Sequence, residues 1–402
     1  MSVDADGNLW TNNNFIPGSQ SILADVGGVL VPDPLAYNGT GVTKLDSNGA
    51  PLSPATGFLG GGTFAAAFGV AIDRRGHVFI GNFGGDSLTE LRPDGTPVSP
   101  DSSSAYSSNG GYRNRRFKDP QSVIIDGDGN IRVTNIGGNT VSQLVGGDPS
   151  NVLTWGGGDC TIGFAQPWGI ASDQRGRIWV TNFGSDSVSV IDPGTSSRPC
   201  PIATYPLSGR PDPGAQPQGI AVDMDGNVWV ARNGRGSIAL LEASRGFAPK
   251  TFRAGGTTVA PWGIAIDGAN NVWVADFFGK RILNLCGASA NCPFGKQRPG
   301  ARISPPGRRD ADEDGKGGGY GANGALQSIT SINIDQAGNV WVANNFINDK
   351  VCLEGAAVPP SGQGSTVGEE RLQPQCGGNG AVVVFGIAGP VAAPLIGPPE
   401  HP

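Results

Sequence analysis

The stretch Gly219-Ile-Ala-Val-Asp223-Met-Asp-Gly-Asn-Val-Trp229-Val-Ala decides the fold, because the chain repeats it with small changes. Each copy has a short apolar run, an Asp, a turn that usually contains Gly and Asn, and a second apolar run that usually contains Trp. Seven copies can be aligned on their Asp, and these anchors are Asp4, Asp73, Asp126, Asp173, Asp223, Asp267 and Asp335. Successive anchors lie 44 to 69 residues apart. A unit of about 45 residues with insertions is typical of propellers and solenoids.

Each repeat predicts a small antiparallel sheet. The first run, Gly219-Ile-Ala-Val in the clearest copy, shows almost no polar alternation, as expected of a strand buried on both faces. The Asp-x-x-Gly-Asn segment predicts a tight turn, because Gly and Asn accept a positive φ. A third run such as Ser187-Val-Ser-Val-Ile191 continues the meander, and a fourth often follows another turn. Four-stranded units repeated radially form a β-propeller, and we predict an all-β fold with seven blades.

We predict one propeller domain over residues 1–388. The first copy is clipped, with only Val3 left of its first strand, so the first blade is expected to be incomplete at the N-terminus. Insertions rich in Gly, Ser and Pro at about 14–40, 101–118, 290–326 and 355–378 predict surface loops. Residues 389–402 are too rich in Pro for a central strand, and we expect an extended tail along the propeller surface.

Composition and charge exclude several classes of protein. The 66 Gly, 32 Pro and 15% charged residues fit an all-β chain with many turns. A net charge of −6 gives no electrostatic footprint for nucleic acid. No apolar stretch approaches the roughly 20 residues that span a membrane. The first residues do not resemble a signal peptide, yet the chain begins inside a repeat, so we expect that an export signal has been removed.

Cysteine usage favours an extracellular, periplasmic or cell-surface location. The six cysteines fall into three neighbouring pairs: Cys160 with Cys200, Cys286 with Cys292, and Cys352 with Cys376. All lie in Gly- and Pro-rich loops that disulfides would staple, and none has the CxxC spacing of a zinc or thioredoxin site. Six cysteines allow 15 connectivities, which the sequence leaves open. Pairing of sequence neighbours is our expectation.

The repeated Trp and Asp residues are best explained by the fold. Aromatic residues recur at one register of the second strand, namely Trp10, Phe79, Trp179, Trp229, Trp273 and Trp341. An aromatic residue in nearly every blade favours packing between blades over ligand contact. The seven anchor aspartates occupy one turn position, and we expect them to cap that turn rather than to bind seven metals.

We look for function where the copies differ, five residues before each anchor. This position enters the inner strand at one rim of the axial channel, and its residues are Phe68, Gln121, Trp168, Gln218, Trp262 and Thr330. A packing requirement common to all blades would select one residue type. The variation therefore indicates a ligand-binding rim that suits sugars or other amphipathic ligands. The alternative is that bulky side chains only plug the channel mouth.

The repeat resembles NHL-type repeats and, more closely, the propellers of the streptogramin lyase (virginiamycin B lyase-like) family, whose blades share Pro-x-Gly-Ile-x-x-Asp-x-x-Gly-x-Val-Trp. The resemblance runs from Asp4 to Val342 and implies the propeller fold. It also implies a rim with a His in a Pro-His-Gly/Ala-Ile setting, a Glu two residues before a His, and a magnesium ion. The matching segments read Asp119-Pro-Gln121-Ser, Gln166-Pro-Trp168-Gly, Gln216-Pro-Gln218-Gly and Ala260-Pro-Trp262-Gly.

These segments lack the imidazole that the resemblance implies. Only Asp119 keeps an acid at the position equivalent to the Glu. The two histidines are His77, in a turn, and His401, in the tail. Without a rim His, the general base of the family is missing, so we expect binding and no streptogramin lyase activity. No Walker or dinucleotide-binding motif is present, and we expect no organic cofactor.

One segment has the spacing of a calcium loop. Asp310-Ala-Asp312-Glu-Asp314-Gly315 places three carboxylates at alternate positions before a Gly, so that they can converge on one hard cation. Gly321 stands where an EF-hand has its twelfth-position Glu. A weak Ca²⁺ site at Asp310, Asp312 and Asp314 is one interpretation, and an ordinary acidic loop is the other.

Three functional hypotheses follow. The first is an exported, non-catalytic propeller that binds a small molecule, glycan or protein through its rim and inserted loops. The second is a metal-assisted lyase or hydrolase that uses carboxylates such as Asp119. The third is a structural subunit of a cell-surface assembly, which low charge, abundant Gly and Pro and disulfides also fit.

Overall fold

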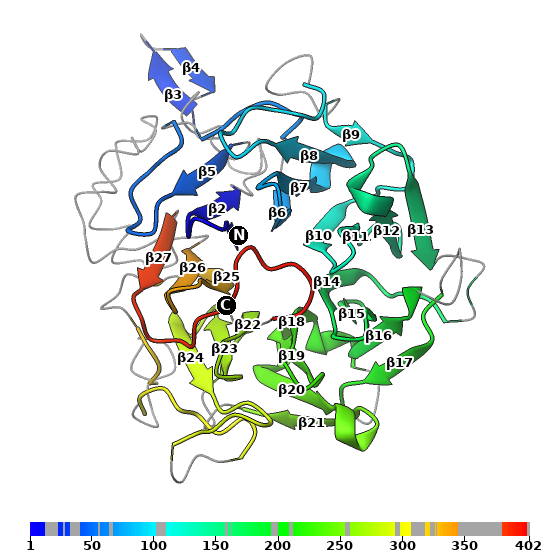
Figure 1. Cartoon of the computed structure of the whole chain (residues 1–402), viewed down its shortest axis with the longest axis vertical. Coiled ribbons are helices and arrows are strands. Elements are labelled where there is room, and N and C mark those ends of the chain that lie inside the picture. Colours follow the sequence, from blue (N-terminus) through cyan, green and yellow to red (C-terminus); the bar gives the residue numbers. More distant parts are fainter. Residues whose placement is uncertain are drawn as a thin grey trace.

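The computed structural model describes residues 1–12, 23–26, 29–32, 41–54, 57–63, 67–101, 110–156, 160, 162–193, 200–208, 212–253, 258–293, 298–306, 318–321, 326, 328–344 and 380–399. These residues form seven antiparallel sheets around a central axis (Figure 1). The predicted all-β, seven-bladed propeller is confirmed. No helix in the described part of the chain is long and apolar enough to cross a membrane.

Four blades have four strands each, which pair in sequence order from the axis outward. Blade 2 consists of β6 (Ala67–Ile72), β7 (Val78–Asn82), β8 (Ser87–Leu91) and β9 (Tyr112–Arg113). Blade 3 consists of β10 (Pro120–Ile125), β11 (Ile131–Asn135), β12 (Thr140–Leu144) and β13 (Val152–Gly156). Blade 4 consists of β14 (Pro167–Ser172), β15 (Ile178–Asn182), β16 (Ser187–Ile191) and β17 (Ala203–Pro206). Blade 5 consists of β18 (Pro217–Val222), β19 (Val228–Arg232), β20 (Ser237–Glu242) and β21 (Ala248–Phe252).

The other three blades show three strands each among the described residues. Blade 6 consists of β22 (Pro261–Ile266), β23 (Val272–Asp276) and β24 (Arg281–Leu285). Blade 7 consists of β25 (Ile329–Ile334), β26 (Val340–Asn344) and β27 (Gly380–Val384). Blade 1 consists of β1 (Ser2–Val3), β2 (Leu9–Asn12) and β5 (Val42–Leu45). The inner strand of blade 1 has only two residues, in agreement with the clipped first repeat, whereas the inner strands of the other blades have six.

Segments outside the blades are short. A two-stranded hairpin of β3 (Leu23–Val26) and β4 (Val29–Pro32) lies within the predicted insertion 14–40. Among the described residues, five 3-10 turns are η2 (Phe83–Gly85), η3 (Val145–Gly147), η5 (Pro213–Ala215), η6 (Asn233–Arg235) and η7 (Ala243–Arg245). The insertion at 355–378 lies outside the described residues.

In each blade the anchor Asp caps its turn and also accepts a hydrogen bond from a side chain, which in five blades is the Trp six residues later. We call this arrangement the lock of the blade. In blade 5, Oδ1 of Asp223 accepts hydrogen bonds from the backbone N–H groups of Asp225 and Asn227 at 3.1 and 2.9 Å. Oδ2 of the same carboxylate accepts from Nε1 of Trp229 at 2.9 Å. The Asp therefore caps its turn, as predicted, and also satisfies the indole N–H of a fully buried Trp. The same Trp–Asp bond occurs at Trp10, Trp179, Trp273 and Trp341.

Two blades replace the Trp and keep the carboxylate satisfied. In blade 3, buried Arg132 pairs with Asp126, with Nε at 2.8 Å from Oδ2, and its guanidinium lies 4.1 Å from the ring centroid of Trp155. In blade 2, Phe79 has no N–H, and Arg75 Nε donates to Asp73 Oδ2 at 2.8 Å. In both blades an arginine donor thus replaces the indole N–H and keeps the carboxylate hydrogen-bonded.

Two of the expected disulfides are present in the described residues. Cys160 bonds to Cys200 and Cys286 bonds to Cys292, each pairing sequence neighbours. Cys352 and Cys376 lie outside the described residues.

Candidate functional site

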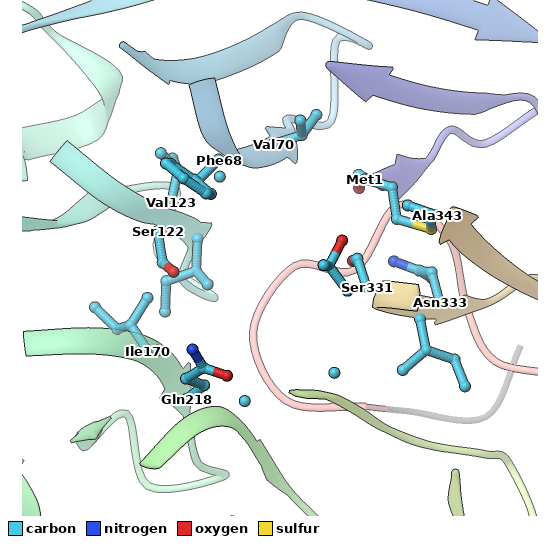
Figure 2. Close-up of a pocket in the computed structure, with 18 of the residues that line it drawn as sticks. Met1, Phe68, Val70, Ser122, Val123, Ile170, Gln218, Ser331, Asn333 and Ala343 are labelled. Carbon is cyan, nitrogen blue, oxygen red and sulfur yellow. The ribbon is translucent and has the colours of Figure 1, made fainter. Parts of the chain in front are cut away.

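The residues at the variable position come together in one cavity at the axis. Phe68, Gln121, Trp168, Gln218, Trp262 and Thr330 all line a cavity of about 290 Å³. Figure 2 shows Gln218 on one wall and Ser331 and Asn333 on the facing wall. All seven blades contribute inner-strand residues to this wall, so the cavity exists only in the closed ring.

The local sequence turns these side chains toward the axis. The pairing of each inner strand with its second strand is interrupted between the first residue of the strand and the residues that follow, for example between Pro167 and Ile170 or between Pro217 and Ile220. Such an irregularity re-aims a side chain. In this way Trp168 and Gln218, which directly follow those prolines, reach the cavity.

Glycine after the rim residue allows the inner strands to approach one another. A Cβ on Gly169 would lie 2.2 Å from the carbonyl oxygen of Gln218, and a Cβ on Gly219 would lie 2.2 Å from that of Trp262. A larger residue would therefore push neighbouring blades apart at the axis. The Pro-x-Gly element of the repeat thus sets both the direction of the rim side chain and the width of the channel.

Three aromatic side chains from alternate blades meet across the cavity. Trp168 lies edge-to-face with Phe68 at a centroid distance of 6.1 Å and with Trp262 at 6.2 Å. These are favourable aromatic geometries. All three side chains remain half-buried, so each keeps accessible surface. The arrangement is both a partial cover of the cavity and an aromatic surface that a ligand can contact.

Each rim aromatic is supported by a Phe of its own blade. Trp168 stacks on Phe183 at 4.8 Å, Trp262 packs on Phe277 at 5.0 Å, and Phe68 packs edge-on against Phe83 at 5.8 Å. These three Phe residues stand ten residues after their anchor Asp. The equivalent positions in the blades with Gln or Thr at the rim are Ile136, Asn233 and Asn345. Sequence reasoning missed this pairing, although the pattern is visible in the sequence.

The two rim glutamines are buried between the aromatic blades. Gln121 is 2% exposed and Gln218 is 4% exposed. The side-chain oxygen Oε1 of each is buried without a hydrogen-bond donor among the described residues. Buried polar atoms in proteins almost always have partners. Two such acceptors at the wall of one cavity therefore call for donors that the described protein groups do not supply.

The C-terminal segment closes the opposite end of the channel. Figure 1 shows this segment, in red, crossing the centre of the ring. Its backbone bonds to the turns of three blades: Gly268 N–H donates to Gly389 O, Val391 N–H to Asp335 O, and Gly397 N–H to Ile125 O. Leu395 reaches the floor of the rim cavity. A second, mostly apolar cavity of about 120 Å³ lies between this segment and the inner strands.

Asp119 lies at the same edge of the propeller but away from the cavity wall. It directly precedes Pro120 of β10, has a φ of 49°, and is not among the described residues that line the cavity. Its backbone N–H donates to Asp86 Oδ1 at 2.7 Å. Lys118 Nζ lies 3.0 Å from Asp86 Oδ2 and 3.9 Å from Asp119 Oδ1. The carboxylate thus belongs to a surface charge cluster.

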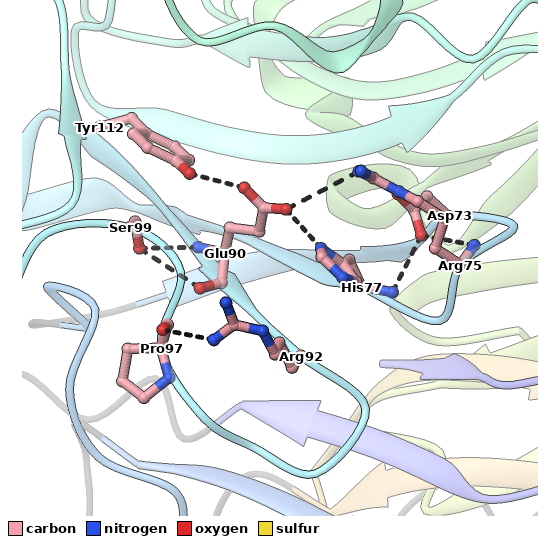
Figure 3. Close-up of polar contacts among 8 residues, drawn as sticks. All are labelled: Asp73, Arg75, His77, Glu90, Arg92, Pro97, Ser99 and Tyr112. Atoms are coloured by element: carbon pink, nitrogen blue, oxygen red, sulfur yellow. Dashed lines mark hydrogen bonds and ion pairs between the residues drawn. The ribbon is translucent and has the colours of Figure 1, made fainter.

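His77 belongs to a polar network in blade 2 (Figure 3). Its Nδ1 lies 2.5 Å from Glu90 Oε1, and the hydroxyl of Tyr112 donates to Glu90 Oε2 at 2.6 Å. Burial raises the pKa of Tyr112 above its ordinary value, and the hydrogen bond to Glu90 raises it further. His77 does not line the cavity, and His401 lies outside the described residues.

The predicted calcium site falls in a part of the chain that the structure does not describe. Asp310, Asp312 and Asp314 lie outside the described residues. Within the described ranges, no group of three or more His, Cys, Asp or Glu side chains could hold a metal ion.

Comparisons with known proteins agree with the fold. The model of the NHL repeat family matches residues 164–191, which include β14, β15 and β16, so the NHL-type repeat predicted from the sequence is confirmed there. A comparison with curated protein sequences finds no match.

Several solved structures are similar to this chain. The extracellular domain of a hybrid two-component system from B. thetaiotaomicron is 13% identical over 85% of this chain and 43% of that chain, with a TM-score of 0.52. An inactive variant of virginiamycin B lyase from Staphylococcus aureus, solved with quinupristin, is 15% identical over 69% of this chain and 76% of that chain, with a TM-score of 0.49. PorZ, a surface component of the type-IX secretion system of Porphyromonas gingivalis, is 16% identical over 75% of this chain and 41% of that chain, with a TM-score of 0.46. At 13% identity the likeness to the extracellular domain concerns the fold alone.

Proposed function

We propose that this chain is an exported, non-catalytic propeller that binds a small ligand in its axial cavity. One observation carries the proposal: the six variable rim residues, five positions before the anchor Asp of each blade from the second to the seventh, all line a single cavity of about 290 Å³. Disulfides at Cys160–Cys200 and Cys286–Cys292 support export, because such bonds persist in oxidising compartments.

The chemistry of the wall supports binding over turnover. Its described side chains at the rim are aromatic, amide and hydroxyl groups, such as Trp168, Gln218 and Thr330. General acid–base catalysis uses groups that titrate near the working pH. The competing enzyme hypothesis needs Asp119, which lies outside this wall.

A ligand screen with a rim variant tests the proposal. Ligand-observed NMR with a library of small molecules should find binders of the wild-type protein. The double variant Trp168→Ala/Trp262→Ala should lose that binding, because both side chains line the cavity. Leu52→Ala is the matched control, since it removes a half-exposed apolar side chain outside the cavity. Unchanged binding by the double variant would show that the rim aromatics are only plugs.

The enzyme alternative has its own test. If the purified protein converts any bound molecule and Asp119→Asn abolishes that turnover, the proposal of a non-catalytic role is wrong. Mass spectrometry under non-reducing conditions tests export, because six free thiols would contradict an oxidising location.

A further inference from the structure

We infer that the axial cavity takes a neutral, polyhydroxylated ligand of about one sugar ring. The inference rests on the proposed binding function and adds the chemical class of the ligand. It starts from the two buried acceptors, Oε1 of Gln121 and Oε1 of Gln218. An unpaired buried acceptor is costly, and a ligand donor removes that cost. Hydroxyl groups are such donors.

The charge of the wall selects a neutral ligand. No charged side chain occurs among the described residues that line the cavity. Met1 also lines it, and burial lowers the pKa of its α-amino group to about 5, so that this group is uncharged at neutral pH. A ligand ammonium or carboxylate would lose its hydration in this cavity and find no side chain of opposite charge there. Burial of an unpaired charge is strongly unfavourable. Serine and threonine hydroxyls at Ser122, Thr330 and Ser331 add groups that both donate and accept. A neutral ligand with several hydroxyls matches this wall.

The position of the aromatics favours a ring with an apolar face. Gln121 and Gln218 come from blades 3 and 5, on either side of blade 4, which contributes Trp168. A sugar ring has hydroxyls at its edge and C–H groups on its face. It can therefore donate to the two amides while its face contacts an aromatic side chain. A purely apolar ligand would leave both amide oxygens unpaired.

The size of the cavity limits the ligand. Its volume of about 290 Å³ lies just below the range of roughly 300–1,000 Å³ for small-molecule sites. The C-terminal segment, through Leu395, forms part of the floor. A single ring fits this blind cavity better than a chain that would have to pass through the channel.

The test compares probes of different chemistry on the wild-type protein. The neutral sugars are glucose, galactose, mannose and N-acetylglucosamine, and the other probes are permethylated glucose, glucuronate, choline and indole. Ligand-observed NMR should show saturable binding of at least one neutral sugar. Permethylated glucose should not compete, because it has the ring but no hydroxyl donor. This comparison requires no variant.

A variant then tests the role of the two amides. Calorimetry of Gln121→Leu/Gln218→Leu should show affinity for the bound sugar reduced by about tenfold or more, since two neutral hydrogen bonds are lost. Gln174→Leu is the control, because it removes an exposed amide at the opposite end of the channel. Equal affinity of the double variant and the wild type would overturn the inference.

The remaining outcomes separate the inference from the proposed function. Saturable binding of indole, choline or glucuronate without binding of any neutral sugar would overturn the inference and leave the binding function standing. The absence of binding by every probe in the panel and in the wider library would overturn both.

Discussion

The two ends of the axial channel are built in opposite ways. At the turn end, the same Asp recurs in every blade and its carboxylate is fully occupied by turn N–H groups and, in five blades, by an indole N–H, as at Asp223 and Trp229. At the rim end, the residue changes from blade to blade, and Gln121 and Gln218 keep unpaired oxygens. Repetition therefore marks the positions that hold the blades together, and variation marks those at which we propose that a ligand binds.

The largest expected effect is at the turn end. Trp229→Ala should lower the free energy of unfolding by about 3–5 kcal/mol, because it removes a fully buried Trp and leaves Asp223 Oδ2 without its indole donor. Chemical denaturation measures this loss. Leu52→Ala, at a half-exposed position, should cost well under half as much. Similar losses for the two variants would show that the lock does not stabilise the blades.

Ending the chain at Phe385 should have a smaller but measurable effect. The truncation removes buried Val391 and the backbone bonds from Val391 and Gly397 to the turns. We expect the free energy of unfolding to fall by about 2–3 kcal/mol, from lost apolar burial and hydrogen bonds. Thermal denaturation checks the change. An unchanged melting temperature would mean that the segment only rests on the turn end.

The rim should respond differently from the turn end. Trp168→Ala/Trp262→Ala removes two half-buried rings and their edge-to-face contacts, and we expect a loss of about 1–3 kcal/mol in total. Per residue this is less than for Trp229→Ala, while ligand binding should disappear. Denaturation and binding of the same sample decide the comparison. If the free energy of unfolding falls as much per residue as in Trp229→Ala while ligand binding is retained, Trp168 and Trp262 are core residues and not ligand-binding residues.

The sequence predicts the turn end well because its information is local. Thirteen residues around Asp223 contain the strand, the turn and the next strand, so seven copies specify the blades directly. The Asp–Trp bond was missed, although the constant spacing of six residues is visible between Asp223 and Trp229. The replacement of the Trp by Arg132 in blade 3 also points to this bond, because Arg132 too supplies an N–H donor to the anchor Asp.

The rim is less predictable because it depends on contacts between distant residues. The variable positions were identified from the sequence, but their meeting in one cavity requires the closed ring. The burial of Gln121 and Gln218 depends on the aromatic residues of neighbouring blades. Residues 389–399 are held across the channel by backbone hydrogen bonds to turns that are distant in the sequence. A Pro-rich segment without periodicity contains no local pattern from which these bonds could be predicted.

Blade 2 offers a prediction at alkaline pH. Burial, and then the hydrogen bond to Glu90, raise the pKa of Tyr112 above its ordinary value of 10.0. Above pH 10 the unfolded chain loses this proton while the folded protein keeps it, so the stability that Tyr112 contributes is present below pH 10 and falls as pH rises further. Tyr112→Phe should reduce this alkaline loss. Denaturation at pH 9 and pH 11 measures the difference, and identical pH dependence in both proteins would contradict the assignment.

The smallest effect on the blades is expected from calcium. We propose that Asp310, Asp312 and Asp314 bind Ca²⁺ weakly, because alternate carboxylates suit a hard cation while Gly321 replaces the bidentate Glu of an EF-hand. Calorimetry should detect binding at millimolar calcium, and Asp312→Asn should weaken it. Because the locks at Asp223 and its equivalents lie in the blades, chelation should leave the melting temperature of the propeller nearly unchanged while increasing proteolysis within 290–326. A lack of binding at millimolar calcium would make the segment an ordinary acidic loop, and a large fall in melting temperature on chelation would mean that this insertion, and not only the repeated locks, holds the ring together.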